Sequence, residues 1–130
     1  MEGTFVITPE GIIPKTNAMV GFIREISTKE ELEELMERMP YITTISAPNR
    51  KVRRELYDIA MEKYEDIEWV KVIKSVYLRM TDHGYEEFEP EYMERAKKYL
   101  YGEIAVRFDI SMDEVEGFVC RYVDNCLKEF

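Results

Sequence analysis

Four cations lie close together in residues 46–57, SAPNRKVRRELY: Arg50, Lys51, Arg53 and Arg54. If Asn49 caps a helix after Pro48, these side chains occupy its first turns, where the helix dipole favours anions. Helix N-termini and guanidinium groups are both good ligands for phosphate. The stretch therefore predicts phosphate binding, and the alternative is a solvated charged face.

The spacing also predicts which side of this helix is buried. At about 100° per residue, the four cations fall on one side and Val52, Leu56 and Ile59 fall on the other. We therefore expect the apolar side to be buried and all four cations to face water or an anion. On that expectation, reversing the charges of Arg53 and Arg54 removes anion binding and leaves stability intact.

Catalytic and metal-binding patterns are not evident elsewhere in the sequence. The single histidine, His83, lies in a loop among acids, which is more typical of a solvated side chain than of a ligand. The acids of residues 30–37 are spaced as the wet face of an amphipathic helix. We found no glycine-rich phosphate loop. The sequence predicts no catalytic residue, no metal, no cofactor and therefore no enzyme.

Charge is distributed unevenly along the 130 residues, whose net charge is -9. Residues 50–80 hold 8 Lys or Arg and 6 Asp or Glu, whereas the segments on either side are net acidic. An acidic chain is not expected to coat nucleic acid indiscriminately, because that affinity comes from neutralising phosphates. Any phosphate contact should therefore come from the middle segment.

The length suits one main domain with a real core. The N-terminus has no secretory pattern, and no apolar run approaches the roughly 20 residues that span a bilayer. We expect no membrane contact and a cytoplasmic location. Cys120 and Cys126 are six positions apart in a helical pattern and point to different sides, so both are expected to be reduced thiols.

Local patterns predict a mainly α fold, a five-helix domain with a short N-terminal β hairpin. The hairpin is formed by TFVI and IIPK around a Pro/Gly turn, and MVGFIREI could add a strand. Capping boxes begin two helices, at Ser27 or Thr28 and at Ser111. Pro90 suits the first turn of a long helix. The expected helices are about 28–39, 49–64, 69–80, 90–108 and 111–123.

Trp69 is the only tryptophan of the chain. It lies beside Val70 at the start of the third expected helix. A half-buried packing role is favoured there over a role as a DNA wedge or stacking platform.

The order of these segments resembles the CarD-like family of bacterial transcription regulators. Its helical C-terminal domain is similar to RELYDIAMEKYEDIEWVKVIKSVYLRM followed by EYMERAKKYLYGEIAVRFDISMDEVEGFV. The segment IIPKTNAMVGFIREISTKEELEELMERMP resembles the junction between the family's two domains, with Pro14, Asn17 and Arg24 in the expected order. The similarity covers about residues 12–119.

The resemblance implies a function in transcription. Members of the family bind RNA polymerase through an N-terminal Tudor-like β domain, and touch promoter DNA through basic residues and a tryptophan of the helical domain. By this resemblance Arg50, Lys51, Arg53 and Arg54 are the expected phosphate contacts. Residues 46–54 contain no aromatic, however, and Trp69 is too far along to supply the wedge.

Only eleven residues precede the resembling segment, so residues 1–26 are expected to be a remnant of the β domain and residues 27–130 the helical domain. This truncation puts RNA polymerase binding in question. A short hairpin alone is marginally stable, and we expect a homodimer through the N-terminal strands. The alternative function is a protein–protein interaction module without DNA binding.

Overall fold

The structure, a computed structural model, describes residues 5–15, 21–82 and 84–123. Within these residues it has five α-helices and a three-stranded antiparallel sheet, so the predicted mainly α fold with an N-terminal hairpin is confirmed. The elements are β1 (Phe5–Thr8), β2 (Gly11–Pro14), β3 (Arg24–Glu25), α1 (Lys29–Arg38), the 3₁₀ turn η1 (Met39–Tyr41), α2 (Arg50–Lys63), α3 (Asp66–Thr81), α4 (Glu89–Phe108) and α5 (Met112–Val123).

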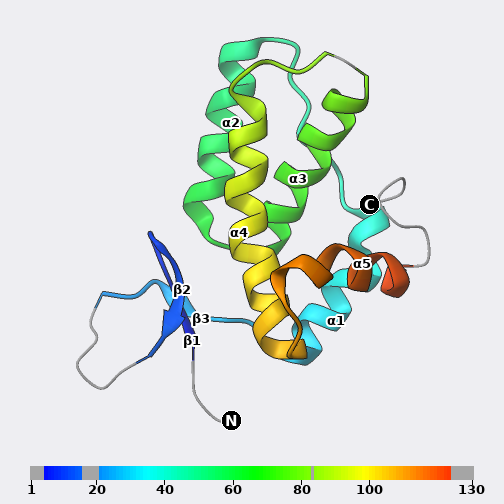
Figure 1. The fold of residues 1–130 in the computed structure, drawn as a ribbon. Coiled ribbons are helices and arrows are strands. Elements are labelled where there is room, and N and C mark those ends of the chain that lie inside the picture. The colour runs from blue at the N-terminus through cyan, green and yellow to red at the C-terminus, as the bar shows by residue number, and fades with distance from the viewer. Residues whose placement is uncertain (1–4, 16–20, 83, 124–130) are drawn as a thin grey trace.

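Three helices stand side by side and the other elements gather at one end of them (Figure 1). α2, α3 and α4 form this bundle, α1 and α5 cross its lower end, and the sheet lies beside the second half of α4. α3 packs against both α2 and α4, and its Val70, Ile73 and Val76 are buried. The bundle supplies most of the core, and β1, α1 and α5 add Ile7, Met36 and Val115 to it.

The helix starts follow from local sequence. Thr28 and Glu31 form the expected capping box, in which the Thr28 hydroxyl accepts from the Glu31 amide at 3.1 Å. Asn49 caps α2, because its Oδ1 accepts from the amides of Lys51 and Val52 at 2.8 and 3.1 Å. Pro90 lies in the first turn of α4, where it needs no amide partner.

The predicted orientation of α2 is wrong. Arg53 and Tyr57 are buried, whereas Val52 and Ile59, which were expected to face the core, are 43% and 51% exposed. The helical period is as expected, but the buried side is rotated by about one residue. Arg53 can occupy a buried position because a carboxylate of α4 lies opposite to it, and periodicity alone does not reveal that partner.

The sheet has the order β2-β1-β3, with Val6 opposite Ile13 and Ile7 opposite Arg24. Val6 and Ile7 are fully buried. Gly102 of α4 faces Ile12, whose Cδ1 would be only 2.7 Å from a side-chain carbon at the glycine. α4 thus approaches the hairpin closely because it has a glycine where they meet.

Hydrogen bonds also tie the hairpin to α4. The Tyr99 hydroxyl reaches the carbonyls of Thr8 and Pro9 at 3.0 and 2.8 Å, and Lys98 Nζ donates to the carbonyl of Glu10 at 2.7 Å. α4 therefore covers the hairpin with an aromatic and a small residue, Tyr99 and Gly102. This removes the reason for expecting a homodimer through the strands.

Arg24 joins β3 to the helices. Its Nε donates to the carbonyl of Tyr64 at 2.7 Å, and its Nη1 donates to Glu103 of α4 at 2.9 Å. The guanidinium also lies 5.5 Å from the centre of the Trp69 ring. Trp69 is fully buried and stacks on Tyr99 at 5.0 Å, so its packing role is confirmed and its burial exceeds the half-burial expected. Asn17 lies outside the described residues.

The prediction of two reduced thiols is wrong for Cys120, which takes part in a disulfide bond. Cys126 lies outside the described residues. The spacing predicts separate thiols only if one helix runs through both positions, and the chain beyond Val123 lies outside the described residues.

The hairpin turn makes a specific prediction. Gly11 has φ +138°, a conformation that L-residues rarely adopt, and an added Cβ would lie 3.1 Å from Lys98 Cε. We expect Gly11→Ala to lower the free energy of unfolding by about 1–2 kcal/mol in urea denaturation. Gly84→Ala is the control, because Gly84 has open space around it and no positive φ, and its effect should stay within about 0.5 kcal/mol. Equal effects of the two changes would contradict the role of the turn.

Candidate nucleic-acid interface

The predicted phosphate-binding cations lie at the start of α2, at the end of the bundle remote from the sheet (Figure 1). Arg50, Lys51 and Arg54 are exposed there. Arg53 is 3% exposed and points inward. The structure therefore brings three of the four predicted residues to one surface and places the fourth in the core.

Arg53 belongs to a buried network around Glu89. Its Nε lies 3.4 Å from Glu89 Oε2, and its Nη1 donates to the carbonyl of Ala47 at 2.6 Å. Glu89 is fully buried and also accepts from the Tyr57 hydroxyl at 2.6 Å and from Arg79 Nε at 2.8 Å. The expectation that Arg53 faces water is wrong. Because Arg53 is buried, we now expect reversal of its charge to destabilise the fold. A glutamate at that position would place a second buried carboxylate beside Glu89, with Arg79 as the remaining counter-charge of the network.

Glu89 is held ionised inside the protein. Burial opposes its ionisation, but hydrogen bonds from the Tyr57 hydroxyl, the Glu86 amide and Arg79 outweigh burial and lower the pKa of Glu89 below its usual value. The role of Glu89 was not predicted from the sequence. The available signal was its position on the same side of the helix as Met93 and Ala96, which are both buried.

Two aromatic rings hold the exposed arginines at the surface. The guanidiniums of Arg54 and Arg50 lie 5.1 and 5.8 Å from the centre of the Phe88 ring. Arg54 Nε also donates to the Tyr92 hydroxyl at 3.4 Å, and that hydroxyl donates to the Asp58 carboxylate. The face of the Phe88 ring and the hydroxyl of Tyr92 thus limit the positions of the two arginines.

Arg95 extends this group along α4. It is exposed, and its guanidinium lies 5.4 Å from the centre of the Tyr92 ring. We call Arg50, Lys51, Arg54 and Arg95 the basic surface. Sequence analysis missed Arg95, which is far from the cluster in the chain and joins it because α2 and α4 are neighbours.

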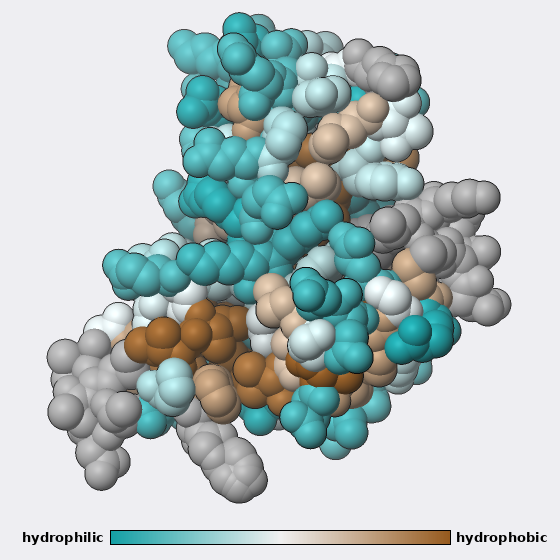
Figure 2. Space-filling view, in the orientation of Figure 1, coloured by the Kyte–Doolittle hydropathy of each residue, from teal (hydrophilic) through white to brown (hydrophobic). Residues whose placement is uncertain are grey.

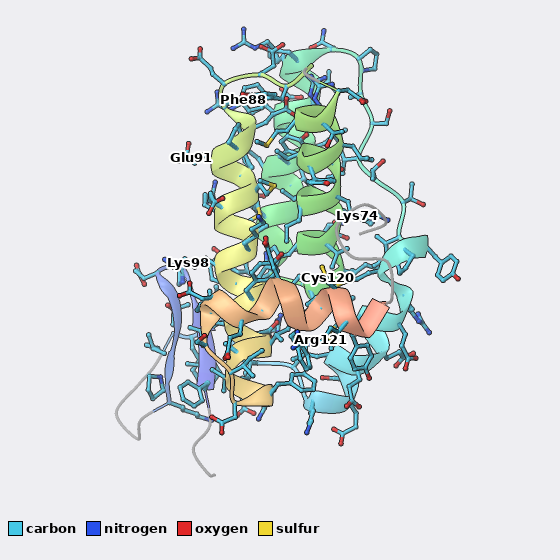
Figure 3. The ribbon with its side chains drawn as sticks, turned by 45° about the vertical axis from the view of Figure 1, so that its right-hand side comes forward. Lys74, Phe88, Glu91, Lys98, Cys120 and Arg121 are labelled. Carbon is cyan, nitrogen blue, oxygen red and sulfur yellow. The ribbon has the colours of Figure 1, made fainter. Side chains whose placement is uncertain are left out.

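Acids lie among these cations and weaken their field. Glu86 Oε1 is 3.9 Å from Arg50 Nε, and Glu91, which is labelled one turn below Phe88 in Figure 3, is exposed on α4. The surface over α2 and the first half of α4 is mostly hydrophilic in Figure 2. The basic surface is thus suited to weak contacts with a chain of regularly spaced anionic groups. Its four residues do not enclose a ligand.

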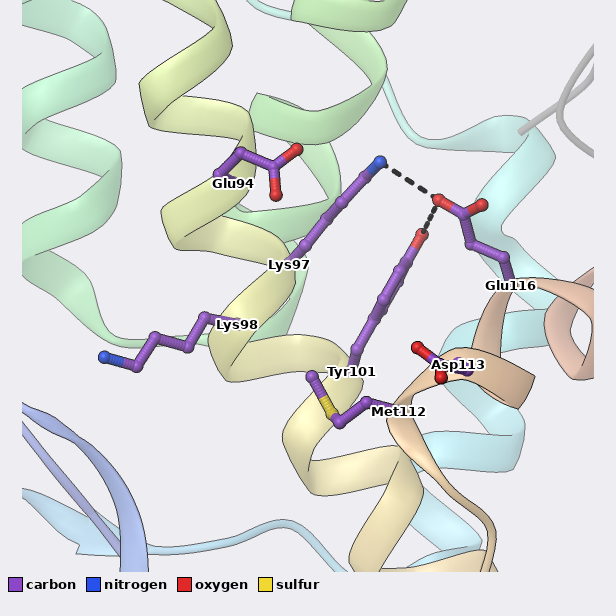
Figure 4. A pocket seen from close by; sticks show the side chains of 7 residues that line it. All are labelled: Glu94, Lys97, Lys98, Tyr101, Met112, Asp113 and Glu116. Carbon is purple, nitrogen blue, oxygen red and sulfur yellow. Dashed lines mark hydrogen bonds and ion pairs between the residues drawn. The ribbon is translucent and has the colours of Figure 1, made fainter.

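A second candidate site is the hollow of about 400 Å³ between α4 and α5 (Figure 4). Lys97 Nζ and the Tyr101 hydroxyl both reach Glu116 Oε2, at 3.0 and 3.4 Å. Burial, and then the nearby Glu116, raises the pKa of Tyr101 above its usual value, so this hydroxyl stays protonated. Lys98 points away from the hollow toward the hairpin. The hollow thus contains an ion pair between Lys97 and Glu116 and a protonated tyrosine, and none of these groups is an activated nucleophile.

Two further features are absent from the described part of the chain. No helix there is long and apolar enough to cross a membrane. No three or more His, Cys, Asp or Glu residues there lie close enough to hold a metal ion. His83 lies outside the described residues.

Comparison with known protein families gives no matching family, and no curated protein matches the sequence. The resemblance to CarD-like regulators remains a prediction from the sequence.

Proposed function

We propose that this chain is a non-enzymatic, cytoplasmic transcription regulator whose helical part contacts promoter DNA and works together with RNA polymerase. The observation that carries the proposal is the basic surface, four exposed cations gathered on α2 and α4 of a chain with net charge -9. The resemblance to CarD-like regulators supplies the polymerase and the promoter.

The contacts proposed are with phosphates and carry little sequence information. Three of the cations lie at the start of α2, where the helix dipole adds to their attraction for anions. Arg95 lies along α4, so the surface could follow a phosphate backbone from one helix to the next. Trp69 is buried against Tyr99 and is not part of this surface.

A salt series tests the proposal. Duplex DNA should bind with a dissociation constant of about 10⁻⁴ to 10⁻⁶ M, nearly independent of sequence, and the affinity should fall steeply as salt rises. The combined variant Arg50→Glu, Lys51→Glu and Arg54→Glu should abolish binding, because each change replaces a phosphate contact with a repulsive charge. Its circular dichroism should be unchanged, since the three side chains are exposed.

A variant with the same change of net charge is the control: Lys15→Glu, Lys29→Glu and Arg121→Glu, all at exposed positions away from α2. It should retain most of the affinity. Trp69 emission should not change when duplex is added, because the ring is buried. Equal loss in both variants, or binding that ignores salt, would count against a phosphate contact and favour the protein–protein interaction module.

A further inference from the structure

Arg54 and Asp58 lie one turn apart on α2, and both side chains are exposed. Opposite charges at this spacing face the same side of a helix and are well placed to form an ion pair. In the described part of the chain, however, these two side chains form no ion pair and meet instead at a third group, the hydroxyl of Tyr92 on α4. This arrangement decides how much of the Arg54 guanidinium is open to an anion.

The Tyr92 hydroxyl lies between the two charges. Its oxygen accepts from Arg54 Nε at 3.4 Å, and its proton is donated to Asp58 Oδ1. The Tyr92 ring is 5% exposed and lies one turn after Phe88, which is labelled in Figure 3. It packs against the rings of Tyr57 and Phe88, with ring centres 5.4 and 6.1 Å apart. The core therefore holds the hydroxyl in place, whereas both of its charged partners are on the surface.

The terminal nitrogens of Arg54 remain open. Nε is the only guanidinium nitrogen of Arg54 that has a hydrogen-bond partner among the described residues. A guanidinium binds phosphate through pairs of its N–H donors. A direct ion pair with Asp58 would use these donors. Because the Tyr92 hydroxyl donates to Asp58, that carboxylate does not compete with a phosphate for Arg54.

We infer that Tyr92 is a positioning residue of the basic surface: its hydroxyl separates Arg54 from Asp58 and keeps the terminal nitrogens of Arg54 available to a phosphate. The same ring lies 5.4 Å from the guanidinium of Arg95, so one side chain of α4 orients a cation from each of two helices. The inference rests on the proposed phosphate contact, and it adds a residue that does not itself touch DNA.

Tyr92→Phe tests the inference, because it removes the hydroxyl and keeps the ring. Arg54 should then pair with Asp58, and the affinity for duplex DNA should fall by about threefold or more. The slope of log affinity against log salt should become shallower by about 0.9, the contribution of one phosphate contact. Circular dichroism and urea denaturation show whether the variant is folded.

Adding Asp58→Asn to Tyr92→Phe should restore both the affinity and the slope, because the competing carboxylate is gone. In the wild type Asp58→Asn should change the affinity by less than about twofold, since Asp58 is already bound by the hydroxyl. Glu91→Gln, which removes another carboxylate near Arg54, should change the affinity by the same factor in the wild type and in Tyr92→Phe. A general effect of negative charge would not distinguish these two carboxylates.

Tyr101→Phe is the matched control. It removes another tyrosine hydroxyl of α4 that faces a carboxylate, Glu116, but lies in the hollow against α5 and outside the basic surface. It should leave the affinity and the salt slope unchanged. In NMR spectra of the protein without DNA, the Nε–H signal of Arg54 should shift in Tyr92→Phe and shift again when Asp58→Asn is added.

The inference is overturned if the wild type binds duplex and Tyr92→Phe binds it equally well, or if Asp58→Asn has the same effect in both backgrounds. It is also overturned if the Arg54 signal does not respond to Tyr92→Phe. Absence of duplex binding by the wild type is a different outcome: it would refute the proposed function itself, and this inference with it.

Discussion

Glu89→Gln is expected to lower the free energy of unfolding by about 3–5 kcal/mol, because it leaves buried arginine charge without its counter-ion. Glu89 is fully buried, and its carboxylate receives Arg53 at 3.4 Å, Arg79 at 2.8 Å and the Tyr57 hydroxyl at 2.6 Å. Arg53 is 3% exposed and cannot turn to water when the negative charge is removed. Glutamine has nearly the same side-chain volume as glutamate, so the loss of stability measures the effect of removing the charge.

Urea denaturation at neutral pH measures this effect, with Glu91→Gln as the control on the exposed side of the same helix. The control should change stability by no more than about 0.5 kcal/mol. The pKa of Glu89 is lowered in the folded protein, so its ionisation stabilises the fold above the ordinary value of 4.5. That stabilisation is lost as the pH falls through the lowered pKa. The difference between wild type and Glu89→Gln should therefore narrow in acid, and a constant difference would contradict the ionised state.

At alkaline pH, Glu103→Gln is expected to have the opposite effect and to raise the free energy of unfolding. Glu103 is fully buried between the sheet and the helices, and its Oε2 accepts from Arg24 and from the Ser27 amide, each at 2.9 Å. Its Oε1 has no hydrogen-bond partner, and the carboxyl group of Asp66 on α3 opposes its ionisation. We expect two neighbouring carboxyl groups of this kind to share one proton. Burial, and then Asp66, raises the pKa of Glu103 to about 9, although Arg24 acts in the other direction.

The pH dependence follows from this shift. Because the pKa of Glu103 is raised in the folded protein, the protonated carboxyl group stabilises the fold. This contribution is complete below the ordinary pKa of 4.5 and is lost as the pH rises through about 9. Wild-type stability should fall by about 1.4 kcal/mol per pH unit at most across that window. Glu103→Gln should lack this slope, because its amide can donate to Asp66 as the protonated carboxyl does. The variant should therefore be the more stable protein at pH 8.

Asp66→Asn is the matched control within the same pair. Asp66 accepts from the Ser27 hydroxyl and lies 3.4 Å from Arg24. Removing its charge takes away the anion that Arg24 needs, so this variant should be less stable than wild type at every pH tested. Chemical denaturation of the three proteins between about pH 5 and 9 separates the two effects. The shared proton is refuted if Glu103→Gln and Asp66→Asn behave alike.

The sequence by itself determined the elements whose causes are local. The Thr28 and Asn49 caps, Pro90 in the first turn of α4 and the turn before Gly11 each depend on residues a few positions apart. These interactions do not depend on tertiary contacts. The five helices and the hairpin could therefore be predicted from sequence patterns. Those patterns also placed Arg50, Lys51 and Arg54 correctly at an exposed helix start.

Only the tertiary structure decided which charges are buried. Arg53 became a core residue because Glu89, which follows it by more than thirty positions, is brought opposite to it by the packing of α2 against α4. Arg95 belongs to the basic surface for the same reason. The hairpin likewise packs against Tyr99 and Gly102 of α4, which is distant in the sequence. A buried charge is stable only beside its partner, and long-range partners are set by packing, which helical periodicity does not encode.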